Sequence, residues 1–60
     1  MKLKVGDTIY VHEPSEPRIG QHGTVTEIGQ YGYFVWVRFP RTKYSEKIRT
    51  GNFRRADAGT

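Results

Sequence analysis

The stretch Tyr33–Phe39, which reads YFVWVRF, decides the fold, and Pro40 ends it. It consists almost entirely of β-branched and aromatic residues, which favour extended strands. Because successive side chains of a strand point to opposite faces, the stretch divides into two sets. One face holds Tyr33, Val35, Val37 and Phe39, and the other holds Phe34, Trp36 and Arg38. The charged Arg38 marks the second face as the outer one, so we predict that the first set faces the core.

Shorter segments of the same kind lie on both sides of this strand, separated by seven glycines and three prolines. We predict further strands at residues 8–11, 23–28, 44–49 and 53–56. Val25 and Ile28 do not share one parity, which indicates a bulge near Thr26. The two glycines of residues 29–32 are typical of a hairpin turn, whereas the two prolines of residues 12–18 indicate a long loop.

No segment shows the 3.6-residue period of an amphipathic helix, so we expect at most one helical turn, near residues 50–53. Five short strands with a long first loop predict an all-β fold, a small five-stranded SH3-like barrel. We expect the barrel over residues 1–56 and a flexible C-terminal tail at residues 57–60. The predicted core consists of Val5, Ile9, Val11, Ile19, Val25, Ile28, Tyr33, Val35, Val37, Phe39, Ile48 and Phe53.

The composition argues against several kinds of site. The chain has 60 residues and no cysteine, so it can form neither a disulfide nor a thiolate zinc site. His12 and His22 are its only histidines, their spacing matches no common metal site, and we expect no metal and no cofactor. No base is placed beside Ser15 or Ser45, and side chains fill the interior of so small a barrel, so we expect no catalytic residue and no small-molecule substrate. A site between the subunits of an oligomer is the one enzymatic arrangement left open.

Hydropathy predicts no membrane-spanning segment. No apolar run approaches the roughly 20 residues that a spanning helix needs, and the N-terminus lacks the apolar core of a signal peptide. We therefore expect a cytoplasmic protein.

Charge is distributed unevenly along this basic chain, which carries a net charge of +4. The first 30 residues hold three Lys and Arg against four Asp and Glu, a net charge of −1. The last 30 residues hold seven against two, a net charge of +5. A basic half attracts an acidic partner such as nucleic acid or an acidic protein, although a solvated basic face that only aids solubility has the same composition.

Aromatic and basic side chains alternate in this second half. The predicted partner-binding residues are Phe34, Trp36, Arg38, Arg41, Lys43, Tyr44, Lys47, Arg49, Arg54 and Arg55. We expect the last two strands to lie near the third, which would gather these residues on one face. Aromatic planes stack on unpaired bases while Arg and Lys neutralise phosphates, so the pattern favours single-stranded nucleic acid. We therefore predict a non-enzymatic binding module, an accessory factor in transcription or translation.

Two alternatives stay open for this surface. An apolar anchor rimmed by positive charge also suits an acidic protein, in which case the chain is a docking subunit or regulator of a larger complex. Phe34 and Trp36 could instead be covered by the long loop or by the C-terminal tail, and then form no binding surface.

The first two strands resemble the opening of KOW-type barrels. The resemblance covers Val5–Val11 and Gly20–Val25, with Gly23 and Val25 at the positions of the KOW motif. Such barrels occur in NusG-like transcription factors and in a ribosomal large-subunit protein. The resemblance implies that the glycine permits a tight backbone bend and that the loops touch RNA.

A second resemblance, to photosystem I reaction-centre subunit IV (PsaE-like proteins), covers more of the chain. The segments that carry it are Gly6–Val11, Gly23–Val25, Val37–Phe39, Tyr44–Ser45 and Thr50–Phe53. It implies an SH3-like barrel without a cofactor, whose basic residues help to dock an acidic protein, ferredoxin. The sequence departs from that family at residues 13–17, where EPSEP replaces an aromatic stretch.

Overall fold

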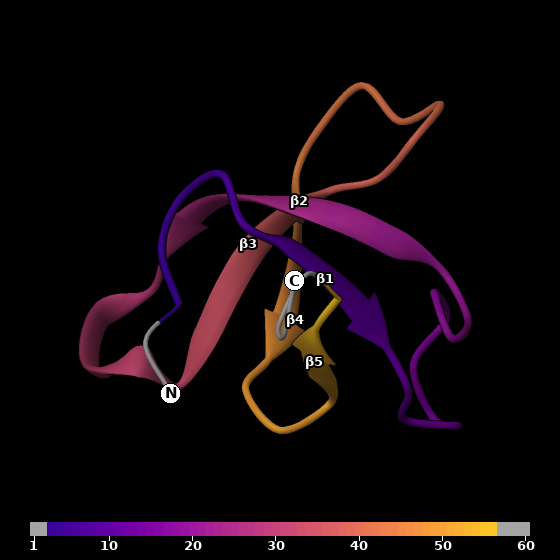
Figure 1. Ribbon diagram of the computed structural model, residues 1–60, viewed down its shortest axis with the longest axis horizontal. Coiled ribbons are helices and arrows are strands. Elements are labelled where there is room, and N and C mark those ends of the chain that lie inside the picture. Colours follow the sequence, from indigo (N-terminus) through magenta and orange to yellow (C-terminus); the bar gives the residue numbers. More distant parts are fainter. Residues whose placement is uncertain (1–2, 57–60) are drawn as a thin grey trace.

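The computed structural model describes residues 3–56, and the predicted tail at 57–60 lies outside this range. The prediction of an all-β fold is confirmed. The strands are β1 (Thr8–Val11), β2 (His22–Ile28), β3 (Phe34–Arg38), β4 (Glu46–Arg49) and β5 (Phe53–Arg55). They form one antiparallel sheet in the order β4-β3-β2-β1-β5, and the sheet curls around its own core (Figure 1). Within the described residues, hydrogen bonds do not join β4 to β5, so the sheet is not closed by pairing.

The register of β2 against β3 confirms the predicted bulge. Val25 pairs with Val37 and Glu27 pairs with Trp36, so the register shifts between Val25 and Glu27. The hydroxyl of the extra residue, Thr26, donates a 3.2 Å hydrogen bond to the carbonyl oxygen of Trp36 on β3. Because a bulge bends its strand, β2 can pair with both β1 and β3 while the sheet curls.

The hairpin between β2 and β3 contains the one helical turn of the described residues, a 3-10 turn at Gln30–Gly32. Tyr31 and Gly32 have φ values of 64° and 71°, which reverse the chain within a few residues. The expected position of a helical turn, residues 50–53, was wrong. There Gly51 has a φ of 104°, and the chain makes a short turn directly into β5.

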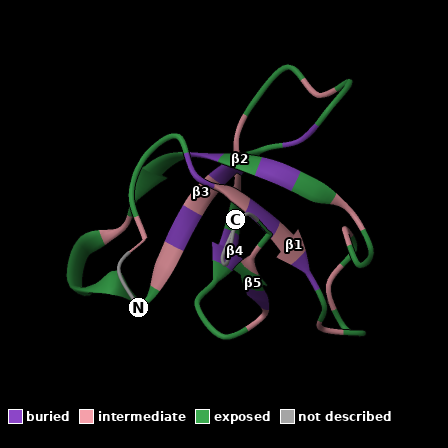
Figure 2. Cartoon of the chain, in the orientation of Figure 1, coloured by how far each residue is buried: buried purple, intermediate pink, exposed green. Residues whose placement is uncertain are grey.

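Eight of the twelve predicted core residues are buried, and in β3 they alternate with more exposed ones (Figure 2). The buried core consists of Ile9, Val11, Val25, Val35, Val37, Phe39, Ile48 and Phe53. The prediction was wrong for Val5, Ile19, Ile28 and Tyr33, which are 60%, 44%, 38% and 72% exposed. Val5 and Ile19 lie in connecting segments rather than strands. Ile28 and Tyr33 flank the hairpin turn, where the sheet extends past the core.

Polar contacts hold the long first loop against the ends of the core strands. Arg18 forms a bidentate ion pair with Glu46 of β4, and its guanidinium lies 5.4 Å from the ring centroid of Phe39. Glu16 accepts a 2.6 Å hydrogen bond from the side chain of Asn52, in the turn before β5. Glu46 shares its parity with the buried Ile48, so this anchor lies toward the core side of β4 rather than on its outer face.

Candidate functional site

The outer face of β3 and β4 brings two aromatic and two basic side chains together. Phe34 pairs in register with Arg49, and Trp36 pairs with Lys47. The rings of Phe34 and Trp36 meet edge to face, with centroids 6.2 Å apart. The Nζ of Lys47 lies 4.7 Å from the centroid of the Phe34 ring, a cation–π distance. These four residues, Phe34, Trp36, Lys47 and Arg49, are called the aromatic–basic surface below.

The close approach of Gly29 holds the Phe34 ring in place. A Cβ at Gly29 would lie 2.6 Å from Cε1 of Phe34 and 2.7 Å from its carbonyl oxygen. The Gly29 amide donates a 2.9 Å hydrogen bond to that same oxygen. Phe34 therefore packs on bare backbone, which explains why an outward-facing ring is half-buried.

Trp36 is half-buried as well. Its strand is tied to its neighbours, because the Thr26 hydroxyl that bonds its carbonyl oxygen also lies 2.6 Å from Oγ of Ser45. The first loop makes its side-chain contacts with Glu46, Asn52 and Phe39, away from this surface. Packing on the sheet, rather than cover by that loop, thus accounts for the partial burial of Phe34 and Trp36.

The ion pair of this region involves Arg18 and Glu46 and leaves the basic side chains of Lys47 and Arg49 available to bind an anion. Glu46 raises the pKa of Arg18, and Arg18 lowers the pKa of Glu46, in both cases chiefly through the hydrogen bonds between the two side chains. Glu46 is thus neutralised by Arg18 on the core side of β4. Within residues 3–56, neither Lys47 nor Arg49 forms an ion pair, and the acidic residue of this face, Glu27, lies across from Trp36 on β2.

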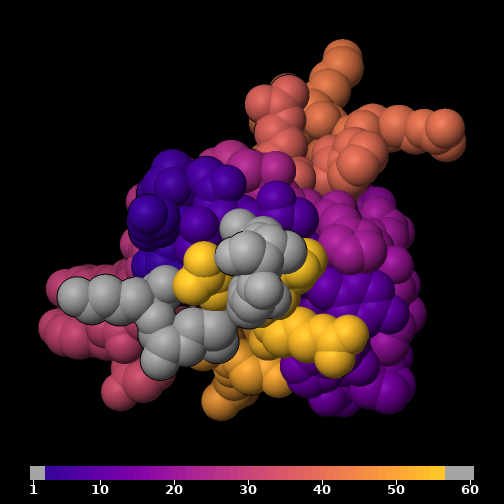
Figure 3. All heavy atoms as spheres, viewed as in Figure 1, coloured from indigo at the N-terminus to yellow at the C-terminus, as the bar shows by residue number. Residues whose placement is uncertain are grey.

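The other predicted site residues lie elsewhere. Arg38 is exposed at the far end of β3, where it pairs in register with Thr24 of β2. Three more are exposed in the loop between β3 and β4, which stands out from the body of the protein (Figures 1 and 3). They are Arg41, Lys43 and Tyr44.

The expectation that the last two strands lie beside the third was correct for β4 and wrong for β5. β5 pairs with β1 at the opposite edge of the sheet, and it cannot lie beside β3 because β2 and β4 already pair with both sides of that strand. Arg54 and Arg55 are therefore separated from the aromatic–basic surface. Arg55 lies 3.7 Å from the carboxylate of the buried Asp7.

A second aromatic cluster, which sequence reasoning missed, surrounds Arg54. Its guanidinium lies 5.1 Å from the ring centroid of Tyr10, and the ring of His22 lies 5.0 Å from that of Tyr10. The parity of Tyr10 against the buried Ile9 and Val11 was a usable signal, because it places Tyr10 on the outer face. The pairing of β1 with β5 was not foreseeable from that pattern.

Other kinds of site receive no support from the described part of the chain. Within residues 3–56, no three His, Asp or Glu side chains are grouped so that they could hold a metal ion. Over the same residues, the structure holds no helix long and apolar enough to cross a membrane.

Comparison with known proteins identifies no relative. The chain matches no protein-family model, no curated protein and no solved structure. The KOW-type and PsaE-like resemblances therefore stay predictions, and the function is argued from the residues themselves.

Proposed function

We propose that the protein binds single-stranded nucleic acid through the aromatic–basic surface of β3 and β4, and acts by binding rather than by catalysis. The observation that carries this proposal is the edge-to-face pair of Phe34 and Trp36 beside two basic side chains, Lys47 and Arg49, that form no ion pair within residues 3–56. Bases stack on exposed aromatic planes, and Lys or Arg neutralise the adjoining phosphates. An accessory role in transcription or translation is the setting that we propose for this activity.

The contact between Lys47 and Phe34 supports this proposal. In the free protein the ammonium covers the face of the Phe34 ring at 4.7 Å. A nucleobase can replace the ammonium on that face, because Lys47 has a long flexible stem and can turn to a phosphate. As the nucleic acid binds, the ammonium group of Lys47 thus moves from the Phe34 ring to a phosphate of the nucleic-acid backbone.

Titration monitored by the single tryptophan, Trp36, tests the proposal. Single-stranded RNA or DNA should quench its fluorescence, whereas heparin, a polyanion without bases, should bind without the same quenching. Trp36→Ala should weaken binding of a labelled oligonucleotide by about 1–3 kcal/mol. Arg49→Gln should reduce the slope of log affinity against log salt by about 0.7, the value for one phosphate contact on a single strand.

Tyr10→Ala is the matched control, since Tyr10 is also a half-buried aromatic on the outer side of the sheet but belongs to β1. It should leave the affinity within about twofold. A larger loss of affinity with Tyr10→Ala than with Trp36→Ala would place binding at β1 rather than at β3 and β4, and would refute the proposal. Equal responses to RNA, DNA and heparin would leave only non-specific electrostatics. Absence of any response, together with capture of an acidic protein, would favour the protein-docking alternative.

A further inference from the structure

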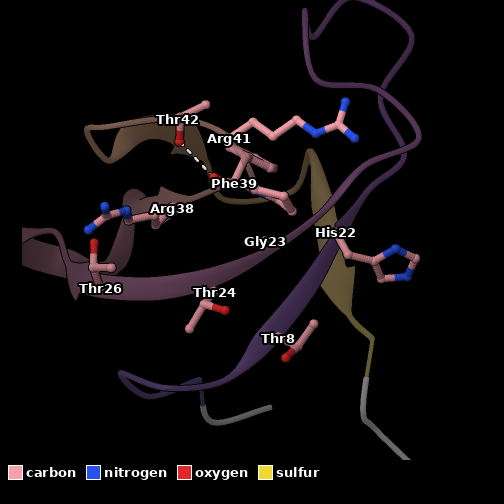
Figure 4. Close-up of a pocket in the computed structure, with 10 residues that line it drawn as sticks. Thr8, His22, Gly23, Thr24, Thr26, Arg38, Phe39, Arg41 and Thr42 are labelled. Atoms are coloured by element: carbon pink, nitrogen blue, oxygen red, sulfur yellow. Dashed lines mark hydrogen bonds between the residues drawn. The ribbon is translucent and has the colours of Figure 1, made fainter.

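An open groove lies beside the aromatic–basic surface, on the outer side of β1, β2 and β3 (Figure 4). Thr8 and Thr24 form part of its floor and are direct partners in the β1–β2 register. Arg38 comes from β3, and Arg41 comes from the turn that follows β3. Two threonines and two arginines from separate segments therefore line one groove, with the two guanidinium groups on opposite sides of it (Figure 4). It is called the threonine–arginine groove below.

The turn after β3 positions Arg41 at the rim of this groove. Thr42 donates two hydrogen bonds to the carbonyl oxygen of Phe39, from its amide at 3.2 Å and from its hydroxyl at 2.7 Å. Arg41 itself has a φ of 71°, a conformation that non-glycine residues rarely adopt. These two bonds close the turn on itself, and Phe39, at the start of the turn, is buried.

The polar groups of the groove differ in whether they already have partners. The hydroxyls of Thr26 and Thr42 are engaged inside the protein. Within residues 3–56, the side chains of Thr8, Thr24, Arg38 and Arg41 form no hydrogen bond or ion pair. Among the residues that the structure describes, no Asp or Glu lines the groove. The described lining therefore presents hydrogen-bond donors and positive charge.

We propose that the threonine–arginine groove binds a phosphodiester of the same nucleic-acid strand whose bases stack on Phe34 and Trp36, an inference that rests on the proposed function. Arginine forks and threonine hydroxyls are the side-chain donors that proteins use for phosphate oxygens. Arg38 and Trp36 lie two residues apart on one face of β3, about 7 Å along the strand. A bound strand can thus place a base on Trp36 and a neighbouring phosphate at Arg38.

The placement also predicts the path of the nucleic acid. The strand runs along β3 from the Phe34 end to the Arg38 end, and then turns over Thr24 and ends at Thr8, the first residue of β1, without reaching Tyr10. Stacking is confined to the first part of this path and phosphate contacts extend over both parts. A strand that reaches the groove must therefore be longer than one that only covers the aromatic–basic surface.

An oligomer of abasic deoxyribose phosphate separates the two parts of the path, because it has phosphates but no bases. Titrated into isotope-labelled protein, it should shift the backbone amide signals of Thr8, Thr24 and Arg41 and leave the indole signal of Trp36 nearly unchanged. Oligouridylate of the same length should shift both sets of signals.

Two variants test the groove with binding as the readout. Arg41→Gln should lower the salt slope for the abasic oligomer by about 0.7. Thr24→Val keeps the shape of the side chain and should weaken binding about five- to tenfold through the lost charge-assisted hydrogen bond. Lys4→Gln is the matched control for charge, because Lys4 is exposed and does not line the groove. It should change the slope by less than half as much as Arg41→Gln.

Each outcome decides between the groove and the proposed function. If oligouridylate quenches Trp36 while both groove variants bind like the wild type, the groove assignment is overturned and the stacking proposal stands. If the abasic oligomer binds in the groove but oligouridylate leaves Trp36 unchanged, the groove stands and stacking is refuted. If neither oligomer binds, both proposals are refuted. If a phosphoserine peptide shifts the groove signals and the abasic oligomer does not, the assignment to a phosphodiester is wrong.

Discussion

Gly23→Ala offers a sharp test of how the core is packed. Gly23 is buried on β2, and a Cβ at this position would lie 2.4 Å from Cγ1 of Val37 and 2.9 Å from two ring carbons of Phe39. Gly23 does not have a positive φ, so an alanine would meet no backbone strain. The expected cost of the substitution is therefore steric, and it arises from two named side chains.

The magnitude follows from opposing contributions. Overpacking a core costs about 1–3 kcal/mol, and the reduced entropy of the unfolded chain returns about 0.4–1 kcal/mol. We therefore expect Gly23→Ala to lower the free energy of unfolding by roughly 1–2 kcal/mol. Val37→Ala alone should cost about 2–3 kcal/mol, since it removes two buried methyl groups and leaves a cavity.

The double variant carries the diagnostic information. The new methyl group of Gly23→Ala would occupy the space that Val37→Ala vacates, so the two costs should not add. We expect a favourable interaction energy of about 1 kcal/mol between the two substitutions, within the range that contacting residues show. Thr24→Ala, at the next and exposed position, is the control and should cost less than about 1 kcal/mol.

Urea denaturation followed by the fluorescence of Trp36 measures these values. A domain of this size rarely exceeds about 3–5 kcal/mol of stability, so the measurements belong near the temperature of maximum stability, about 10–20 °C. Additive costs in the double variant, or wild-type stability of Gly23→Ala, would refute the inferred contact of β2 with the Val37 and Phe39 side chains.

Two further predictions concern charged residues of the framework. Asp7→Ala should lower the free energy of unfolding by roughly 2–4 kcal/mol in urea titrations. The reason is that the buried carboxylate accepts a 2.9 Å hydrogen bond from the Lys4 amide and lies 3.7 Å from Arg55. Unchanged stability would contradict a stabilising role for Asp7. Since Arg18 lowers the pKa of Glu46, the ionised pair stabilises the fold above the pKa of an unfolded glutamate, and this contribution is lost as the pH falls through the depressed value. The stability difference between wild type and Glu46→Gln should therefore shrink from neutral pH toward about pH 3, and a difference that does not vary with pH would refute the role of the pair.

Local pattern predicted much of the fold. Alternation in Tyr33–Phe39 correctly assigned Val35, Val37 and Phe39 to the core and Phe34, Trp36 and Arg38 to the outer face. The same rule indicated the bulge at Thr26. These predictions succeeded because the period of a strand and the break of that period are properties of neighbouring residues.

Candidate site residues were predictable only as far as the β3–β4 hairpin extends. Lys47 and Arg49 lie beside Trp36 and Phe34 because the two strands are consecutive and antiparallel. Arg54 follows soon after in the sequence, yet it lies against Tyr10 at the far edge of the sheet. The distance between two segments in the sequence does not show which strand the later segment will pair with.

The sequence by itself determined the all-β class, the principal strands and the inward or outward phase of the longest strand, since these depend on residue type and on a period of two. Only the tertiary structure decided that β5 pairs with β1, that Phe34 rests on Gly29, and that Thr8, Thr24, Arg38 and Arg41 line one groove. Those contacts join segments distant in the sequence. They depend on how the curled sheet wraps around its core, and a local sequence pattern does not predict this.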